Sequence, residues 1–252
     1  MTMKILPALL AIGSCCAAAH LSRAADKAFS EYAGTVEARL AERHSIREVA
    51  PDSIRVEAVK PPAQLPGALL HHWRAAAFVP GASAEQMLAL LRDYNMLPRY
   101  YAPQIASARV LADDGKSAVL RVRMKEQKVW TIVLDAEYSV ESGLVGNDRG
   151  YSASRSTSVW QIDNPGSGSE RRRTPGDDDG YLWRLNSYWS FTRARGGLAI
   201  ECEAISLTRD VPLGLGWLIA PVIQNLPSET LQFTIKSTKN ALLEIASKKG
   251  TR

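Results

Sequence analysis

The residues best suited to acid–base chemistry or metal binding in this 252-residue chain are its four histidines and three cysteines. His71 and His72 are the one adjacent histidine pair. Neighbouring side chains of a strand point to opposite faces, so these two cannot hold one metal from the same side. Either imidazole could face an internal space as an acid or base, or lie at the sheet surface or near a strand end. The pattern predicts no metal site.

Cys202 lies in a stretch, Leu198 to Ile205, in which apolar and polar residues alternate. This setting is typical of a small buried strand residue rather than of a nucleophile. The other cysteines, Cys15 and Cys16, belong to an apolar N-terminal stretch that we expect to be removed. Cys202 would then have no partner for an internal disulfide, so the fold must depend on its core.

Sequence motifs of several large enzyme classes are missing. The chain has no Gly-x-Ser-x-Gly elbow, no His-Glu-x-x-His, no P-loop and no dinucleotide-binding glycine pattern after a strand. These motifs mark hydrolases, metalloproteases and enzymes that bind phosphates or dinucleotides. The sequence therefore predicts no catalytic residue and no cofactor, and it favours a protein that is not an enzyme.

The first residues resemble a secretory signal. Lys4 precedes an apolar run, residues 5–19, and small residues surround Ser22-Arg23-Ala24. This order predicts a signal peptide over 1–24 and an exported, periplasmic or secreted protein. The run is too short for a membrane span, which needs about 20 residues. Alternatively, Ile12-Gly-Ser-Cys15 is a lipobox, and Cys15 anchors a lipoprotein.

Charge argues against nucleic acid as a partner. Removal of 1–24 takes away Lys4 and Arg23, so the 31 basic residues fall to 29 against 26 acidic ones. Nucleic-acid binding needs a concentrated basic face. The run Arg171-Arg172-Arg173 is followed by Asp177-Asp178-Asp179, which nearly cancels it, and we expect a solvated hairpin tip there.

The elements that must position these residues follow from hydrophobic periodicity. Helices are expected at 26–45, 84–92, 93–101 and 228–246. Strands are expected at 54–59, 69–79, 105–111, 117–125, 129–140, 151–162, 181–192 and 198–208. Grouped strands with helices at either end predict an α+β fold with one antiparallel sheet. We expect a helical, Pro-rich extension over 25–66 and one domain over 67–248.

Alternation assigns each strand an apolar face, directed at the last helix, and a charged face, which we expect to be solvated. Arg184 is expected to pair with Glu201 or Glu203 across neighbouring strands, in preference to a buried charge cluster. The apolar face mixes aromatic and small residues, among them Ala75, Ala136, Ser187 and Ala204. Such a face can enclose a ligand cavity or form a filled core.

This order of elements resembles the START-like (SRPBCC, helix-grip) superfamily, which includes coenzyme Q-binding proteins, polyketide cyclases and lipid-transfer START domains. The resemblance covers about residues 68–246. It rests on the strand 70–78, on 83–101 with Asp93-Tyr94 and Pro98-Arg99-Tyr100-Tyr101, on the strand pair 182–189 and 201–210, and on the helix from Pro227-Ser228. It implies a curved sheet of about seven strands that grips the C-terminal helix, with two short helices after the first strand.

The resemblance also implies a tunnel for a sterol, phospholipid, quinone or polyketide. The residues expected to line it are Trp73, Ala75, Tyr101, Trp130, Leu134, Trp183, Leu185, Trp189, Ile200, Ala204 and Ile235. The Gly/Pro-rich stretch Pro212–Leu218 could admit ligand, and its part Leu213–Leu218 could touch a membrane surface. Alternatively, the stretch could pack against the sheet edge.

Three functions remain open from the sequence. The first is binding or carriage of an apolar small molecule or lipid without catalysis. The second is a polyketide cyclase or aromatase-like enzyme, for which His72 and Arg155 are candidates for mutation. The third is an envelope interaction protein with a filled core. Export disfavours the second, because polyketide substrates are made in the cytoplasm.

Overall fold

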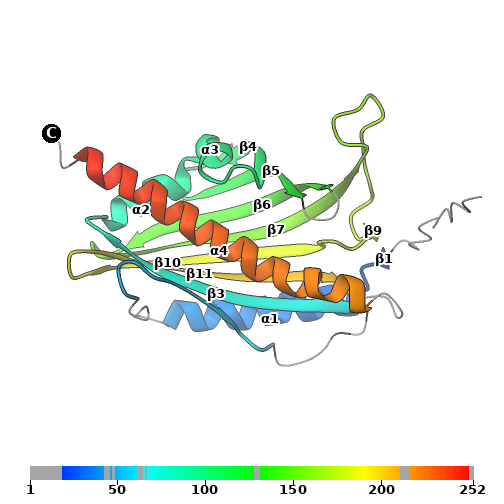
Figure 1. The fold of residues 1–252 in the computed structure, drawn as a ribbon, viewed down its shortest axis with the longest axis horizontal. Helices are drawn as coiled ribbons and strands as arrows, with labels where there is room; N and C mark the ends of the chain where they lie inside the picture. The colour runs from blue at the N-terminus through cyan, green and yellow to red at the C-terminus, as the bar shows by residue number, and fades with distance from the viewer. Residues whose placement is uncertain are drawn as a thin grey trace, which may run out of the picture.

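The computed structural model describes residues 19–42, 46, 49–61, 65, 67–127, 131–210 and 216–249, with the side chains of 226–248 in the last range. The lipobox cysteine Cys15 and most of the predicted signal peptide lie outside these residues. An antiparallel sheet runs in the order β2-β3-β11-β10-β7-β6-β5-β4, and α4 crosses it diagonally (Figure 1).

The strands are β1 (Ala19–His20), β2 (Ile54–Ala58), β3 (Ala68–Pro80), β4 (Ile105–Asp113), β5 (Ser117–Gln127), β6 (Thr131–Val145), β7 (Arg149–Asp163), β8 (Arg171–Arg172), β9 (Asp177–Asp178), β10 (Arg184–Ala194) and β11 (Gly197–Arg209). The helices are α1 (Arg23–Glu42), α2 (Ala84–Arg92), the 3₁₀ turn η1 (Tyr94–Met96), α3 (Leu97–Tyr100) and α4 (Gly216–Lys249). This arrangement confirms the α+β, helix-grip prediction.

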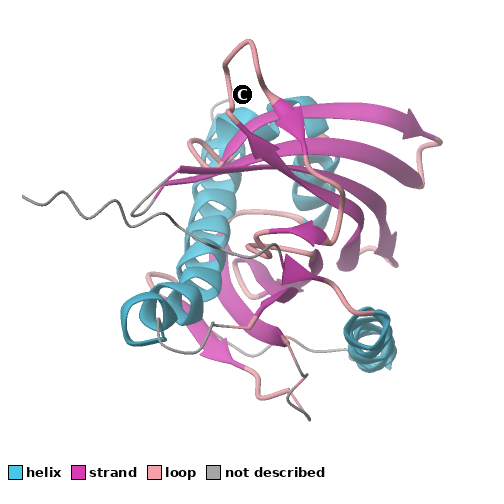
Figure 2. Cartoon of the chain, turned by 90° about the vertical axis from the view of Figure 1, so that its right-hand side faces the viewer, coloured by secondary structure: helices cyan, strands magenta, loops and turns pink. Residues whose placement is uncertain are grey.

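The sheet is larger than the seven strands predicted. It has nine, because β2 from the predicted extension pairs with β3, and β8 pairs with the end of β7. The extension also supplies α1. Figure 2 views α1 end-on, and it packs on the face of the sheet opposite α4.

Helix α2 begins where the sequence predicts. The Ser83 side chain accepts a hydrogen bond from the Gln86 backbone N–H, and the Gln86 side chain accepts one from the Ser83 N–H. This capping box satisfies two backbone donors that a helix start leaves free. The start of helix α4 differs from the prediction. The helix begins at Gly216 rather than at Ser228, and it continues through Pro221 and Pro227. Each proline removes one intrahelical donor, but packing of α4 along β3 sustains the helix.

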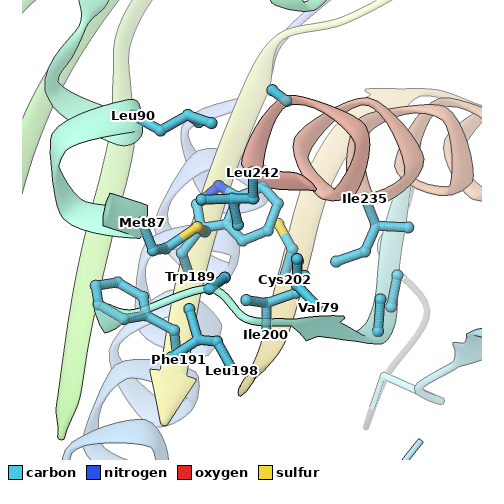
Figure 3. Packing of buried hydrophobic residues seen from close by; sticks show 14 of the residues in the cluster. Val79, Met87, Leu90, Trp189, Phe191, Leu198, Ile200, Cys202, Ile235 and Leu242 are labelled. Carbon is cyan, nitrogen blue, oxygen red and sulfur yellow. The ribbon is translucent and has the colours of Figure 1, made fainter. Parts of the chain in front are cut away.

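The main core lies between α2, α4 and strands β3, β10 and β11. Figure 3 labels several of its members: Val79, Met87, Leu90, Trp189, Phe191, Leu198, Ile200, Cys202, Ile235 and Leu242. Gly150 of β7 permits the close approach of one of them, because a Cβ there would lie 2.2 Å from the Phe191 ring. A second cluster covers β5, β6 and β7 and includes Tyr94 of η1.

Candidate functional site

The inner face of the sheet, which we define as the face toward α4, is apolar as alternation predicts. On β3 it carries Trp73, Ala75, Ala77 and Val79. On β5 and β6 it carries Leu120, Val122, Leu134, Ala136 and Tyr138, while the ion pairs Arg121–Glu137 and Arg123–Asp135 of these strands point away.

One row of paired residues across this face is fully covered. Ala75 pairs with Cys202, Cys202 with Trp189, and Trp189 with Ser152. Their exposed fractions are 0%, 1%, 6% and 4%. We call these four residues the sealed row. It lies in the part of the core that contacts α2 and the second half of α4.

The next row toward the N-terminal end of β3 differs. Trp73 pairs with Ala204, Ala204 with Ser187, and Ser187 with Ser154. All four are only half-buried, although they face inward on the same four strands. We call them the open row. Because its side chains are large, small and hydroxylated in turn, the open row offers a partly accessible, mainly apolar surface with a few polar groups, the usual make-up of a ligand site.

A histidine stands beside the open row. His71 lies two residues before Trp73 on β3, so both point to the inner face. Its Nε2 lies 3.2 Å from Thr208 Oγ1 on β11. Burial lowers the pKa of the His71 imidazole below its ordinary value, which keeps the ring neutral at neutral pH.

A polar contact also fixes α4 at the closed end. The Tyr101 and Thr238 hydroxyl oxygens are 2.9 Å apart, and both side chains are buried. Burial raises the pKa of Tyr101 to about 12. Arg92 of α2 donates to the Ser142 hydroxyl at 3.0 Å and to its carbonyl at 2.6 Å. These bonds close one end of the inner face.

The predicted lining residues divide between these regions. Trp73 and Ala204 belong to the open row, and Leu185 is half-buried next to it. The others that the structure places on the inner side are buried in the core: Ala75, Tyr101, Leu134, Trp189, Ile200 and Ile235. Trp130 lies outside the described residues. Sequence reasoning left His71 without an assigned face and omitted Ser154 and Thr208, although alternation along β3, β7 and β11 could have found them.

The assignment of Trp183 to the inner face is wrong. Trp183 precedes β10 and packs with Ile205, Leu207 and Phe29 of α1 on the outer face. Its indole N–H donates to Asp178 at 3.1 Å. Alternation does not extend to a residue that stands before the regular strand begins.

The outer face is charged as predicted. Helix α1 covers the part of it formed by β3, β11, β10 and β7, so the expectation of a solvated face is wrong there, whereas Lys125 of β5 is exposed as expected. Glu203, with a fully buried side chain, accepts hydrogen bonds from His72 at 2.9 Å, Arg74 at 2.9 Å and Arg39 of α1 at 3.1 Å. The Tyr32 hydroxyl lies 2.8 Å from His72 Nδ1. Burial alone would raise the pKa of Glu203, but its partners outweigh it and lower the pKa to about 2.

Other predicted roles on this face change as well. Arg184 stands opposite Leu207 and pairs with Asp26 of α1 at 2.9 Å, not with Glu201 or Glu203. Arg155 binds Glu37 of α1 at 2.7 Å. Neither Arg155 nor His72 faces α4, so neither is available to a ligand on the inner face. The buried charge cluster that the sequence disfavoured is the arrangement found.

The loop of arginines and aspartates is less solvated than expected. Arg172 donates to Asp135 at 2.8 Å and stacks on Trp160, with 5.0 Å from its Cζ to the ring centroid. Asp178 is buried beside Trp183. These contacts hold the loop against the outer face of β6 and β7.

The described part of the chain contains no group of three or more histidine, cysteine or carboxylate side chains arranged to hold a metal. Within the same residues, no helix is both long and apolar enough to cross a membrane. Of the stretch predicted to touch a membrane, residues 213–215 and the side chains of 216–218 lie outside what is described.

Comparison with known proteins identifies the fold. Neither protein-family models nor curated protein sequences give a match. Among solved structures, a STAR-related lipid transfer protein fragment from Xanthomonas axonopodis matches at 20% identity with a TM-score of 0.51, over 79% of this chain and 97% of that one. Human STARD10 matches at 12% identity and 0.49, over 87% and 81%. The Zhui aromatase/cyclase from Streptomyces matches at 12% and 0.46, over 71% and 94%. The match to the Xanthomonas fragment, together with the topology of the sheet and α4, shows that the chain has the START-like, helix-grip fold.

Proposed function

We propose that this protein binds and carries an apolar small molecule or lipid on the inner face of its sheet, without catalysis. The observation that carries the proposal is the open row, where Trp73, Ala204, Ser187 and Ser154 remain half-buried beneath the gripping helix. Burial of apolar ligand surface there is favourable by about 25 cal/mol per Å². The fold it shares with a protein named for lipid transfer is consistent with this role.

The proposal extends to where the protein acts. The charged, apolar and small-residue order of the N-terminus supports export to the periplasm or beyond. Leu213–Leu218, with Trp217, is apolar enough to rest at a membrane surface while ligand passes. Export and membrane contact are separate proposals, and either can be wrong while the proposal of ligand binding holds.

Native mass spectrometry tests the ligand proposal. The chain from residue 19 would be purified without detergent, weighed intact, and extracted with organic solvent. We expect a stoichiometric bound molecule that partitions into the solvent. A clean unliganded mass, with no uptake from lipid and quinone mixtures, would contradict the proposal and favour an interaction protein with a filled core.

A matched pair of variants locates the molecule. Ala204→Leu adds three carbons to the open row, whereas Ala112→Leu adds them at an exposed position of β4. We expect the first variant to lose the bound molecule and the second to retain it. Loss in both, or in neither, would place the ligand elsewhere.

A further inference from the structure

The charges around the open row restrict what can bind there. The nearest basic side chains of the same strands point to the outer face and are held by carboxylates. Arg74 is bound to Glu203, and Arg155 to Glu37. Arg184 forms an ion pair with Asp26, with 2.9 Å between its Nε and Asp26 Oδ1. Residues 211–225, which precede α4 and form its first turns, contain no Asp, Glu, Lys, Arg or His.

An anionic headgroup on the inner face would therefore lack a cationic partner among the described residues of these strands. Transfer of an ionised group from water to an apolar site without a partner is strongly unfavourable. Neutral polar groups meet a different environment. Ser154 and Ser187 present hydroxyls in the open row, and His71 presents an imidazole beside it.

The hydrogen bonds of His71 determine which group it can accept. The Thr208 hydroxyl donates to the Arg209 carbonyl at 3.3 Å, so its oxygen accepts from the His71 Nε2–H at 3.2 Å. A neutral imidazole with its hydrogen on Nε2 has a lone pair on Nδ1. Among the described residues, no donor is bonded to that atom.

From this geometry we propose that the ligand is an uncharged apolar alcohol, whose hydroxyl donates to His71 Nδ1 while its hydrocarbon body lies along the open row against Trp73. The inference rests on the proposed function and narrows its ligand class. It separates alcohols from anionic lipids, which lack a cationic partner here, and from ketones and quinones, which have no hydroxyl hydrogen to donate.

Titrations that follow intrinsic tryptophan fluorescence, to which Trp73 contributes, test the inference with ligands that differ in one group. The probes are cholesterol, cholestenone and cholesterol sulfate, together with hexadecanol and hexadecanoate. We expect at least one alcohol to bind, and its ketone or charged analogue to bind at least about tenfold more weakly, the effect of one unpaired buried polar group. Equal or tighter binding of a charged analogue would overturn the inference.

Variants assign the effect to the histidine. His71→Leu should weaken alcohol binding about tenfold and leave ketone binding unchanged, which removes the discrimination. Thr208→Val is the alternative if His71→Leu does not fold. It removes only the hydrogen-bond partner of His71 Nε2, and it should reduce the preference for alcohol over ketone. Arg109→Ala, at an exposed position of β4, is the control and should behave as wild type. Unchanged discrimination in both inner-face variants would overturn the role of His71.

The experiments distinguish an error in the inference from an error in the proposed function. If a charged lipid is the molecule extracted from the purified protein, the inference is wrong and the carrier function stands. If no probe binds, the inference is also overturned. The carrier function falls only if, in addition, no molecule accompanies the purified chain.

Discussion

The sealed row and the open row are neighbours on the same four strands and are built from similar residues. Each has a tryptophan, an alanine and a serine. The sealed row lies in the core shared with α2 and the Thr238 end of α4, whereas the open row lies at its margin, where Trp73 and Ala204 pack against that core but are only half-buried. Residue types therefore do not distinguish core from binding surface here. The two rows are distinguished by the elements that cover them.

The largest expected difference concerns the two tryptophans. Trp189→Ala should destabilise the fold by about 3–5 kcal/mol, because it leaves a cavity in a close-packed region. Trp73→Ala, at the half-buried position, should lower the free energy of unfolding by clearly less. Urea denaturation of both variants measures the difference. Equal losses would mean that the open row is packed as tightly as the sealed one.

Enlarging an alanine in each row gives the next effect. Ala75→Leu should destabilise by about 1–3 kcal/mol, because the sealed row has no room for added carbons. Ala204→Leu should change unfolding free energy little, since its neighbours are only half-buried. Thermal and urea unfolding of both proteins would check this. A comparable loss in Ala204→Leu would favour a filled core over a ligand site.

The smallest effect is chemical rather than energetic. Burial raises the pKa of the Cys202 thiol, so it should react slowly with thiol reagents in the native protein. A cysteine placed in the open row by Ser187→Cys should be labelled faster, and bound ligand should slow it. Labelling rates followed by mass spectrometry compare the two sites. Protection of both thiols in the ligand-free protein would show that the open row is sealed.

Much of the inner face could be predicted because strand alternation is a local property. The faces of Trp73, Ala136 and Trp189 follow from parity along their own strands. Trp183 was misplaced because parity holds only where the strand is regular, and β10 begins one residue later. The contrast between Ala75 and Ala204 was beyond sequence reasoning, since it depends on which helices lie above each residue.

The outer face was misjudged for a related reason. Glu203 and Arg74 alternate with apolar residues, as the side chains of a solvated face do. Their burial depends on α1, more than 160 positions away from Glu203 along the chain, with Arg39 placed against the carboxylate. Local pattern cannot reveal that an N-terminal helix supplies the matching charges for a distant strand.

By itself, the sequence determined the α+β class, the order of strands and helices, the inner and outer sides of regular strands and the capped start of α2. These follow from periodicity and local hydrogen bonding, which involve residues close together in the chain. Only the tertiary structure decided that α1 buries the charged face of β3 and β11, that β2 enlarges the sheet and that one inner row is sealed while the next stays open. Those outcomes depend on contacts between distant segments, where packing and desolvation act on residues whose own sequences look alike.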